Sequence, residues 1–289
     1  MRLLIFITFL LLATSASAGL RVVTTIQPIH SITASIMQGV GEPELLIPAT
    51  TSPHHFNLRP SQRRSLEHAD LLIWLGAPLE GFMPRIIPSL PDEVSTLSLL
   101  GPSEGHHEHG HEDINPHIWL DPVQTVVISE NIRDALIQLD PLHKAQYRQN
   151  AVALKQRLLA LDDHLNQQLS PVKDRPFIVF HDAYGHLVEH YGLLQVGIVT
   201  LDEHQPPGGR HLQALRSQLK EQTIPCLFTE PQFEPAIVEN LISGTSTRVQ
   251  SLDPVGSDYA SGPNAYFEMM KALGHNLSQC LSEEKPEEN

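Results

Sequence analysis

Residues 140–169 read DPLHKAQYRQNAVALKQRLLALDDHLNQQL, and this stretch indicates how the chain is organised. Asp140 and Pro141 end the helical pattern that begins at Pro122 and start a new one. Apolar side chains then recur at helical spacing; they are Ala151, Leu154, Leu158, Leu161 and Leu165. A helix of about thirty residues is about 40 Å long at 1.5 Å per residue, which is long for one compact domain. The stretch therefore predicts a rod that joins two lobes.

Strands and helices alternate on both sides of this rod. Before it, apolar and β-branched runs predict strands at 21–26, 44–47 and 71–75, with helices at 28–38 and 61–69 between them. After it, the predicted strands are 177–180, 196–200, 226–229 and 249–252, again separated by helices. Such alternation is typical of parallel sheets covered by helices. We expect an α/β fold of two parallel-sheet lobes bridged by one long helix, with boundaries at 19–139, 140–169 and 170–289.

The first residues predict export. Met1 and Arg2 carry positive charge, and the apolar run that follows is too short to cross a bilayer of about 30 Å as a helix. Ala16-Ser17-Ala18 has the small-residue pattern of a cleavage site, so we expect a signal peptide at 1–18 and a periplasmic protein. The alternative is an uncleaved anchor helix. No cysteine stands directly after Ala18, which argues against a lipid anchor.

The charge of the chain narrows its possible partners. Asp and Glu number 33 against 19 Lys and Arg, and the formal net charge is −14. Nucleic acid needs a basic face, so it is not an expected partner. No later stretch is apolar and long enough to span a membrane, so we expect no stable membrane insertion. An acidic chain is compatible with attracting cations, but composition alone identifies no site.

The two cysteines, Cys226 and Cys280, would lie in an oxidising compartment. Pairing is the default there, so we predict one disulfide bond. The alternative is a pair of zinc-binding thiolates.

Three histidines occupy positions where a strand or loop ends beside polar residues. They are His54 in SPHHF, His117 in NPHIWLDP and His181 in FIVFHDAY, and Asp253 follows another predicted strand. Ligands of open α/β sheets bind beyond the carboxyl ends of the strands. Three imidazoles and a carboxylate make a tetrahedral zinc site, and here they would meet in the cleft between the lobes. Any one of these residues alone would more simply be a structural histidine or a turn aspartate.

The surrounding motifs resemble those of a known family. They are PHHF with RPS at 53–61, NPHIWL at 115–120, FHDAYG at 180–185, EPQF at 230–233 and LDPVG at 252–256. Together they resemble the cluster A-I metal-binding proteins of zinc and manganese ABC importers, most closely the ZnuA-like zinc-uptake type, over essentially the whole chain after residue 18. The resemblance implies metal ligation by His54, His117 and His181, with Asp253 as ligand or neighbour of the ion. It also implies a Cys226–Cys280 disulfide, two lobes on one long helix, and delivery of the metal to an inner-membrane permease.

The sequence leaves some site assignments open. Some relatives carry Glu where this chain has Pro53, so the fourth ligand is Asp253, water or Glu203. His55 competes with His54 for the first position, and the motif favours His54. Asp182, Glu203 and Asp121 are candidates for orienting the imidazoles, or simply solvated loop acids.

Residues 105–113, GHHEHGHED, contain His106, His107, His109 and His111. This stretch resembles a short histidine-rich loop of zinc-uptake proteins and would hold a second, looser zinc ion. The alternative is a polar loop without a specific role.

The expected function is capture of Zn²⁺ by a monomeric, non-enzymatic binding protein that serves an ABC permease. Imidazole-rich sites suit Zn²⁺, while Mn²⁺ prefers more oxygen ligands. The rival from another class is a zinc hydrolase, but the chain has no HExxH, CxxC or GxSxG motif. A third reading is a surface adhesin, against which the missing anchor cysteine counts. The single bridging helix predicts small movements between the lobes.

Overall fold

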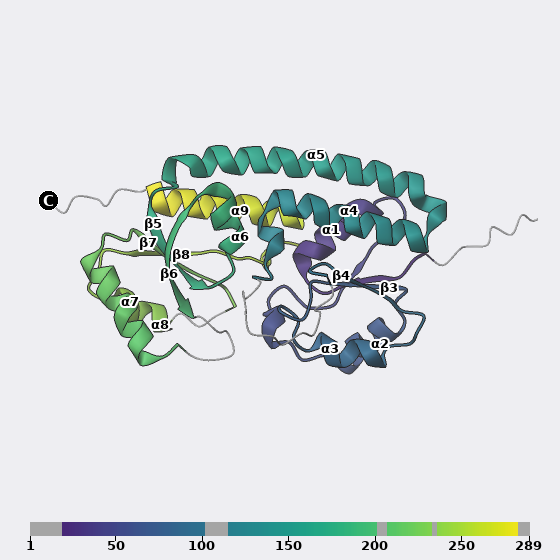
Figure 1. The fold of residues 1–289 in the computed structure, drawn as a ribbon, viewed down its shortest axis with the longest axis horizontal. Coiled ribbons are helices and arrows are strands. Elements are labelled where there is room, and N and C mark those ends of the chain that lie inside the picture. Colours follow the sequence, from purple (N-terminus) through teal and green to yellow (C-terminus); the bar gives the residue numbers. More distant parts are fainter. Residues whose placement is uncertain (1–18, 102–114, 201–206, 233–235, 283–289) are drawn as a thin grey trace, which may run out of the picture.

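The computed structural model describes residues 19–101, 115–200, 207–232 and 236–282. They form two lobes, each built on a four-stranded parallel sheet. Figure 1 shows the lobes side by side, with helix α5 (Lys144–Leu169) running along both. The expectation of two parallel-sheet α/β lobes on one long helix is therefore confirmed. The predicted signal peptide, 1–18, lies outside the described residues.

The N-terminal sheet has the strand order β2-β1-β3-β4. Its strands are β1 (Val22–Thr24), β2 (Glu44–Leu45), β3 (Leu71–Trp74) and β4 (Ser95–Ser98). The helices of this lobe are α1 (Gln27–Met37), α2 (Pro60–Glu67), α3 (Met83–Ile86) and α4 (Pro122–Leu139). Short 3-10 turns, η1 (Pro53–His55) and η3 (Ile118–Leu120), interrupt the loops. Both turns lie beside histidines that the sequence analysis singles out.

The C-terminal sheet has the order β6-β5-β7-β8. Its strands are β5 (Pro176–His181), β6 (Leu194–Thr200), β7 (Cys226–Thr229) and β8 (Arg248–Ser251). Its helices are α6 (Gly185–Tyr191), α7 (Gly209–Glu221), α8 (Ala236–Ile242) and α9 (Ala265–Ser282).

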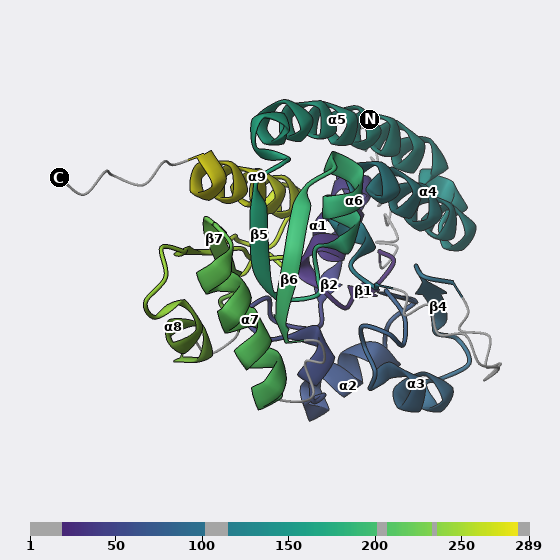
Figure 2. The same ribbon diagram turned by 60° about the vertical axis from the view of Figure 1, so that its left-hand side comes forward.

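Both faces of the C-terminal sheet are buried at its central strands, β5 and β7. Successive side chains of a strand point to opposite faces, and in β5 Phe177 and Val179 join the main core while Ile178 and Phe180 join a second core. The second core includes residues of α7 and α8, and the main core includes residues of α5 and α9. Figures 1 and 2 accordingly show α7 and α8 across the sheet from α5. Burial on both faces explains why the central strands β5 and β7 are nearly continuous apolar runs.

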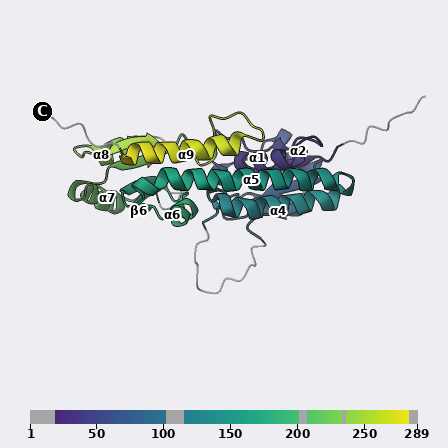
Figure 3. The same cartoon turned by 90° about the horizontal axis from the view of Figure 1, so that it is seen from above.

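Helix α5 is held by its leucine stripe. All five apolar residues that predict the helix are buried. The helix packs against α1 and α4 of one lobe and α9 of the other, and Figure 3 shows it between α4 and α9. The contact with α9 is close, since a Cβ atom at Gly274 would lie 2.5 Å from Cδ2 of Leu165. Any larger residue at this position would require the Leu165 side chain to shift.

Buried hydrogen bonds join the lobes directly as well. The side-chain amide of Gln27 in α1 donates to the carbonyl of Gly256 at 2.5 Å. The indole of Trp119 donates to the carbonyl of Pro254 at 2.7 Å, and the carbonyl of Trp119 accepts from the Tyr266 hydroxyl at 2.9 Å. The loop after β8 is thus fixed against the N-terminal lobe.

Cys226 of β7 and Cys280 of α9 form a disulfide bond, as predicted. The bond ties the last helix to the middle of the C-terminal sheet and excludes the alternative of two zinc-binding thiolates. Among the helices in the described part of the chain, none is apolar over a length that would cross a membrane.

Candidate metal centre

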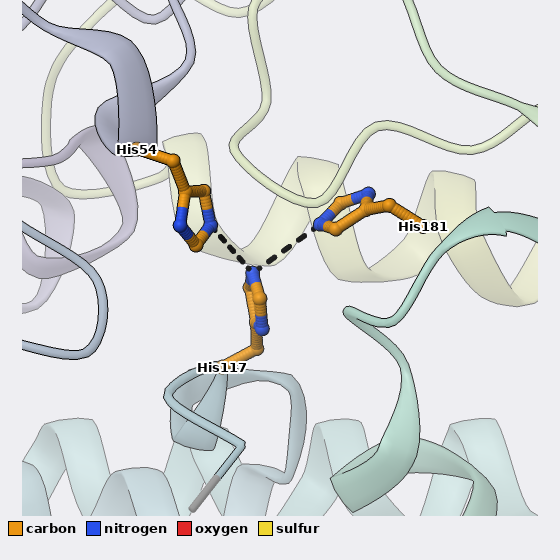
Figure 4. Close-up of side chains that lie close together, drawn as sticks. All are labelled: His54, His117 and His181. Carbon is orange, nitrogen blue, oxygen red and sulfur yellow. Dashed lines mark hydrogen bonds between the residues drawn. The ribbon is translucent and has the colours of Figure 1, made fainter. Parts of the chain in front are cut away.

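Three histidines from distant parts of the chain converge between the lobes. His54 lies in η1, His117 directly precedes η3, and His181 ends β5. Figure 4 shows their imidazoles pointing toward one another, with His117 in the middle. The Nε2 atom of His117 lies 3.4 Å from Nε2 of His54 and 3.4 Å from Nε2 of His181. Each of the three residues offers a ligand nitrogen within 4.8 Å of the other two.

These distances fit one bound ion. Zinc–nitrogen bonds of 2.0–2.1 Å at tetrahedral angles place two ligand nitrogens about 3.3 Å apart. The imidazoles need little rearrangement to share a single cation. His54 is half-buried and its neighbour His55 is exposed, so the convergence favours His54 over His55.

Asn115 sets the orientation of the His117 ring. Its Oδ1 atom accepts hydrogen bonds from the backbone N–H of His117 at 3.1 Å and from Nδ1–H at 2.8 Å. An amide oxygen only accepts, so Nδ1 carries the proton and Nε2 is left with its lone pair toward the site. Asn115 also donates from Nδ2 to the carbonyl of Asp182 at 2.9 Å, beside His181. One side chain therefore ties two candidate ligands from different lobes.

Glu230 sets the orientation of His181. It directly follows β7, is 4% exposed, and accepts a hydrogen bond from Nδ1 of His181 through Oε1. A carboxylate behind an imidazole fixes its tautomer and raises its basicity as a ligand. Glu230 stands in the EPQF motif at 230–233, but no role was expected for it. The signal was available, because an acid directly after a buried strand is the same signal that identifies His181.

Neither of the two acids in the described part of the chain that were expected to orient the imidazoles is hydrogen-bonded to one of the three histidines. Asp121 caps α4, because its Oδ1 atom accepts from the N–H groups of Val123 and Gln124. The side chain of Asp182 is exposed. Glu203 lies outside the described residues, as do His106, His107, His109 and His111.

Burial keeps the central imidazole neutral. The pKa of His117 is held well below its usual 6.5, first by desolvation and then by the neighbouring His181, His54 and His186. Metal ligands must be deprotonated, so a low pKa suits ligation.

Asp253 lies near the site but its carboxylate is engaged in its own loop. Oδ1 accepts from the N–H groups of Val255 at 3.1 Å and Gly256 at 3.0 Å, and from Nε2 of Gln232 at 3.1 Å. Oδ2 accepts from the N–H of Ser257 at 2.5 Å and from its hydroxyl at 2.6 Å. Among the described residues, the converging group consists of the three histidines and does not include Asp253.

The space beside the imidazoles is small. The pocket has a volume of about 20 Å³, and its wall includes the three histidines together with Trp119, Glu230 and Gln232. Three nitrogen donors and one further position describe a four-coordinate ion. The site is the right size for a cation with one small additional ligand.

Known proteins match this chain in sequence over nearly its whole length. The family model "Zinc-uptake complex component A periplasmic", abbreviated ZnuA, matches residues 22–280. The chain is 33% identical to the high-affinity zinc uptake system protein ZnuA of Brucella suis, over 93% of this chain and 94% of that protein. It is 32% identical to the Haemophilus ducreyi protein of the same name, over 96% and 98%.

Solved structures agree in fold. A crystal structure of ZnuA matches with a TM-score of 0.79 at 24% identity, covering 91% of this chain and all of that one. The laminin-binding protein Lmb of Streptococcus agalactiae, described as an adhesin with metal-transporting activity, matches with a TM-score of 0.78 at 25% identity over 91% and 100%.

Proposed function

The chain belongs to the ZnuA family of periplasmic zinc-uptake components, and we propose that it captures Zn²⁺ with high affinity and delivers it to the permease of an ABC importer. The observation that carries the proposal is the convergence of three imidazoles whose ligand nitrogens lie within 4.8 Å of one another. Two of them have their Nδ1 protons held by Asn115 and Glu230. An arrangement in which imidazole nitrogens point their lone pairs at one position is stabilised when a cation lies between them.

The proposed protein ligands are His54, His117 and His181. Three neutral imidazoles favour Zn²⁺ over Mn²⁺, which prefers oxygen donors and higher coordination numbers. Asp253 is proposed to act near the ion through its loop. The histidines of 105–113 remain a proposal for a second, weaker zinc site.

The proposed protein is a carrier and not an enzyme. Three histidines with an open fourth position also describe catalytic zinc sites, so the ligand set alone does not decide between the two. A pocket of about 20 Å³ supports the carrier, because the space beside the imidazoles has room for an ion with one small ligand.

The remaining parts of the proposal concern location and organisation. We propose a cleaved signal peptide at 1–18, a periplasmic monomer, and lobes at 19–139 and 170–289 joined by 140–169. The family membership supports the compartment and the permease as partner.

Zinc titration of single alanine variants tests the function. His54→Ala, His117→Ala and His181→Ala should each weaken zinc binding more than about 100-fold in competition with a chelator, since losing a ligand costs more than losing an outer contact. The matched control is His275→Ala, an exposed histidine of α9, which should bind zinc like the parent. Wild-type affinity in all three site variants would refute the assignment.

A further inference from the structure

His186 contacts the N-terminal lobe with both of its ring nitrogens. It is a half-buried residue of α6 in the C-terminal lobe. Its Nε2 atom lies 2.9 Å from the backbone carbonyl oxygen of Asn115, and its Nδ1 atom lies 3.0 Å from Nε2 of Gln124 in α4. Figure 2 shows α6 beside α4. One imidazole ring therefore bridges the two lobes, next to the residue that orients His117.

The partners of the His186 ring fix the position of its proton. A carbonyl oxygen only accepts hydrogen bonds, so Nε2 of His186 donates to Asn115. Nδ1 is then the acceptor, and the side-chain amide of Gln124 donates to it. The two nitrogens hold different parts of the N-terminal lobe, because Nε2 binds the chain just before His117 and Nδ1 binds a helix.

The carbonyl group that His186 holds belongs to the residue behind His117. Asn115 accepts from Nδ1–H and from the backbone N–H of His117, and it donates to the carbonyl of Asp182. The next residue, Pro116, has no N–H and offers no backbone donor to fix this stretch. The hydrogen bond from His186 therefore limits how far Asn115 can move relative to the His117 ring.

Gly185 contacts the same asparagine from the same end of α6. A Cβ atom at Gly185 would lie 3.0 Å from Nδ2 of Asn115, so the glycine lets the amide approach the helix closely. Asn115 is thus held at two places by consecutive residues, since Gly185 makes room for its side chain and His186 binds its carbonyl oxygen.

We propose that His186 is a positioning residue of the metal site, which acts through Asn115 to hold the His117 ring in the orientation that binds the ion. The inference rests on the proposed function. His186 does not belong to the converging group of histidines in the described part of the chain, and hydrogen bonds engage both of its nitrogens. Loss of its contact with Asn115 should therefore weaken zinc binding while all three ligands are retained.

Two substitutions separate the contacts of the ring. His186→Gln places a donor near the position of Nε2 and can keep the hydrogen bond to Asn115, whereas His186→Asn places an acceptor near the position of Nδ1 and can keep only the bond to Gln124. In chelator competition, His186→Gln should bind zinc like the parent, and His186→Asn should bind it about tenfold more weakly, at the low end for contacts behind a metal ligand. Histidine and asparagine have similar helix propensities, so α6 itself should form equally well.

Gln124→Met is the matched control. It removes the partner of Nδ1 but leaves the bond between His186 and Asn115, so it should bind zinc like the parent. A tenfold loss in Gln124→Met would mean that His186 acts by joining α6 to α4, and it would overturn the inference. Thermal unfolding of the apo proteins checks that all variants fold.

Proton NMR of the apo protein tests the same contact without zinc. The Nδ1 proton of His117 is held by Oδ1 of Asn115. It should exchange with water slowly in the parent and in His186→Gln, and clearly faster in His186→Asn. Equal exchange rates in the parent and His186→Asn would contradict the positioning role.

The two proposals fail in different ways. Wild-type zinc affinity in His186→Asn, with binding lost in His117→Ala, would sink the inference and leave the function intact. A parent protein that binds no zinc would overturn both.

Discussion

At the scale of single residues, the two histidines with known orienting partners differ in what stands behind them. The amide of Asn115 behind His117 is neutral, while the carboxylate of Glu230 behind His181 carries charge. Both partners fix the tautomer in which Nε2 carries no proton and can bind the ion. Only Glu230 also adds negative charge close to a divalent cation, so the two contacts should contribute differently to affinity.

The charge of Glu230 can be tested apart from its shape. Glu230→Gln retains an acceptor for Nδ1 of His181 but removes the charge, so zinc affinity should fall about 10- to 100-fold. Chelator competition measures the change. Glu93→Gln, at an exposed position, is the control. Unchanged zinc affinity in Glu230→Gln would show that the carboxylate does not support the site.

Gly185 gives Asn115 the room it needs. A Cβ atom at Gly185 would lie 3.0 Å from Nδ2 of Asn115, the atom that donates to Asp182. Gly185→Ala should therefore displace the amide behind His117 and weaken zinc binding severalfold. The helix itself should not suffer, because alanine is the better helix former.

Affinity and thermal stability measured on the same Gly185→Ala sample separate these effects. Gly208→Ala is the matched control, since nothing lies within 4 Å of its Cβ position. Full zinc affinity in Gly185→Ala would contradict the role given to Asn115.

The sequence predicts those parts of the site whose residues stand in one recognisable stretch, and it does not predict contacts between distant stretches. The three histidines are predictable because each stands at the end of a strand or in a distinctive motif. The engagement of Asp253 with its own loop is not, because the same residues are compatible with a carboxylate turned toward the ion. Likewise, the pairing of Glu230 with His181 depends on β7 lying next to β5, which no stretch of sequence specifies alone.

At the scale of elements, strands that are buried on both faces give the most direct signal in the sequence. β3 and β5 are continuous apolar runs and lie where expected. β4, with the sequence STLS, lies at the edge of its sheet with partly exposed polar side chains and is missed. An edge strand of this kind has no hydrophobic periodicity from which it could be predicted.

A buried acid joins two of these strands. Glu80 is fully buried, and Oε1 accepts from the Thr25 hydroxyl at 2.5 Å and from the N–H of Leu75 at 3.1 Å, while Oε2 accepts from the N–H of Gly76 at 3.0 Å. Thr25 follows β1, and Leu75 follows β3. Desolvation raises the pKa of Glu80 from 4.5 to about 7 despite these hydrogen bonds.

The raised pKa predicts a pH dependence of stability. Between pH 4.5 and about 7 the unfolded chain loses the Glu80 proton while the folded chain keeps it. The contribution to the free energy of unfolding is therefore complete below pH 4.5 and is lost as pH rises through 7, by up to about 3 kcal/mol. In urea unfolding of the apo protein, Glu80→Gln should remove the dependence of the free energy of unfolding on pH between 4.5 and 7. Any other effect of the substitution on that free energy should be the same at every pH. Parallel curves for the two proteins between pH 4.5 and 7 would contradict the assignment.

The disulfide bond also joins two elements, strand β7 and helix α9. Cys226 and Cys280 are 54 residues apart, and closing such a loop restricts the unfolded chain. Replacing both cysteines by alanine should lower the free energy of unfolding by about 2–4 kcal/mol. Urea unfolding of the oxidised parent and the double variant measures it. A loss well below 1 kcal/mol would show that α9 is held by its packing alone.

At the scale of the whole molecule, the lobes are joined in two ways. Helix α5 packs on both lobes without a break, and the buried hydrogen bonds of Gln27, Trp119 and Tyr266 cross between them. The sequence predicts the first through the leucine stripe. It does not reveal the second, because Gln27 and Gly256 are separated by 229 positions and carry no local signal for pairing.

This double connection predicts that zinc binding changes the overall shape little. A hinged protein closes around its ligand by turning about a few flexible residues, whereas here such a turn would break buried hydrogen bonds at the metal-site loop. Small-angle scattering of the apo and zinc-loaded protein should therefore give radii of gyration within about 0.5 Å of each other, for a chain of this size near 19 Å. Gln27→Ala removes the α1 contact to the loop after β8 and should loosen the apo form, giving faster hydrogen exchange in that loop with α5 unaffected. A radius that shrinks by several ångströms on zinc binding would mean that the lobes open and close, and that the hydrogen bonds of Gln27 and Trp119 belong to the closed state alone.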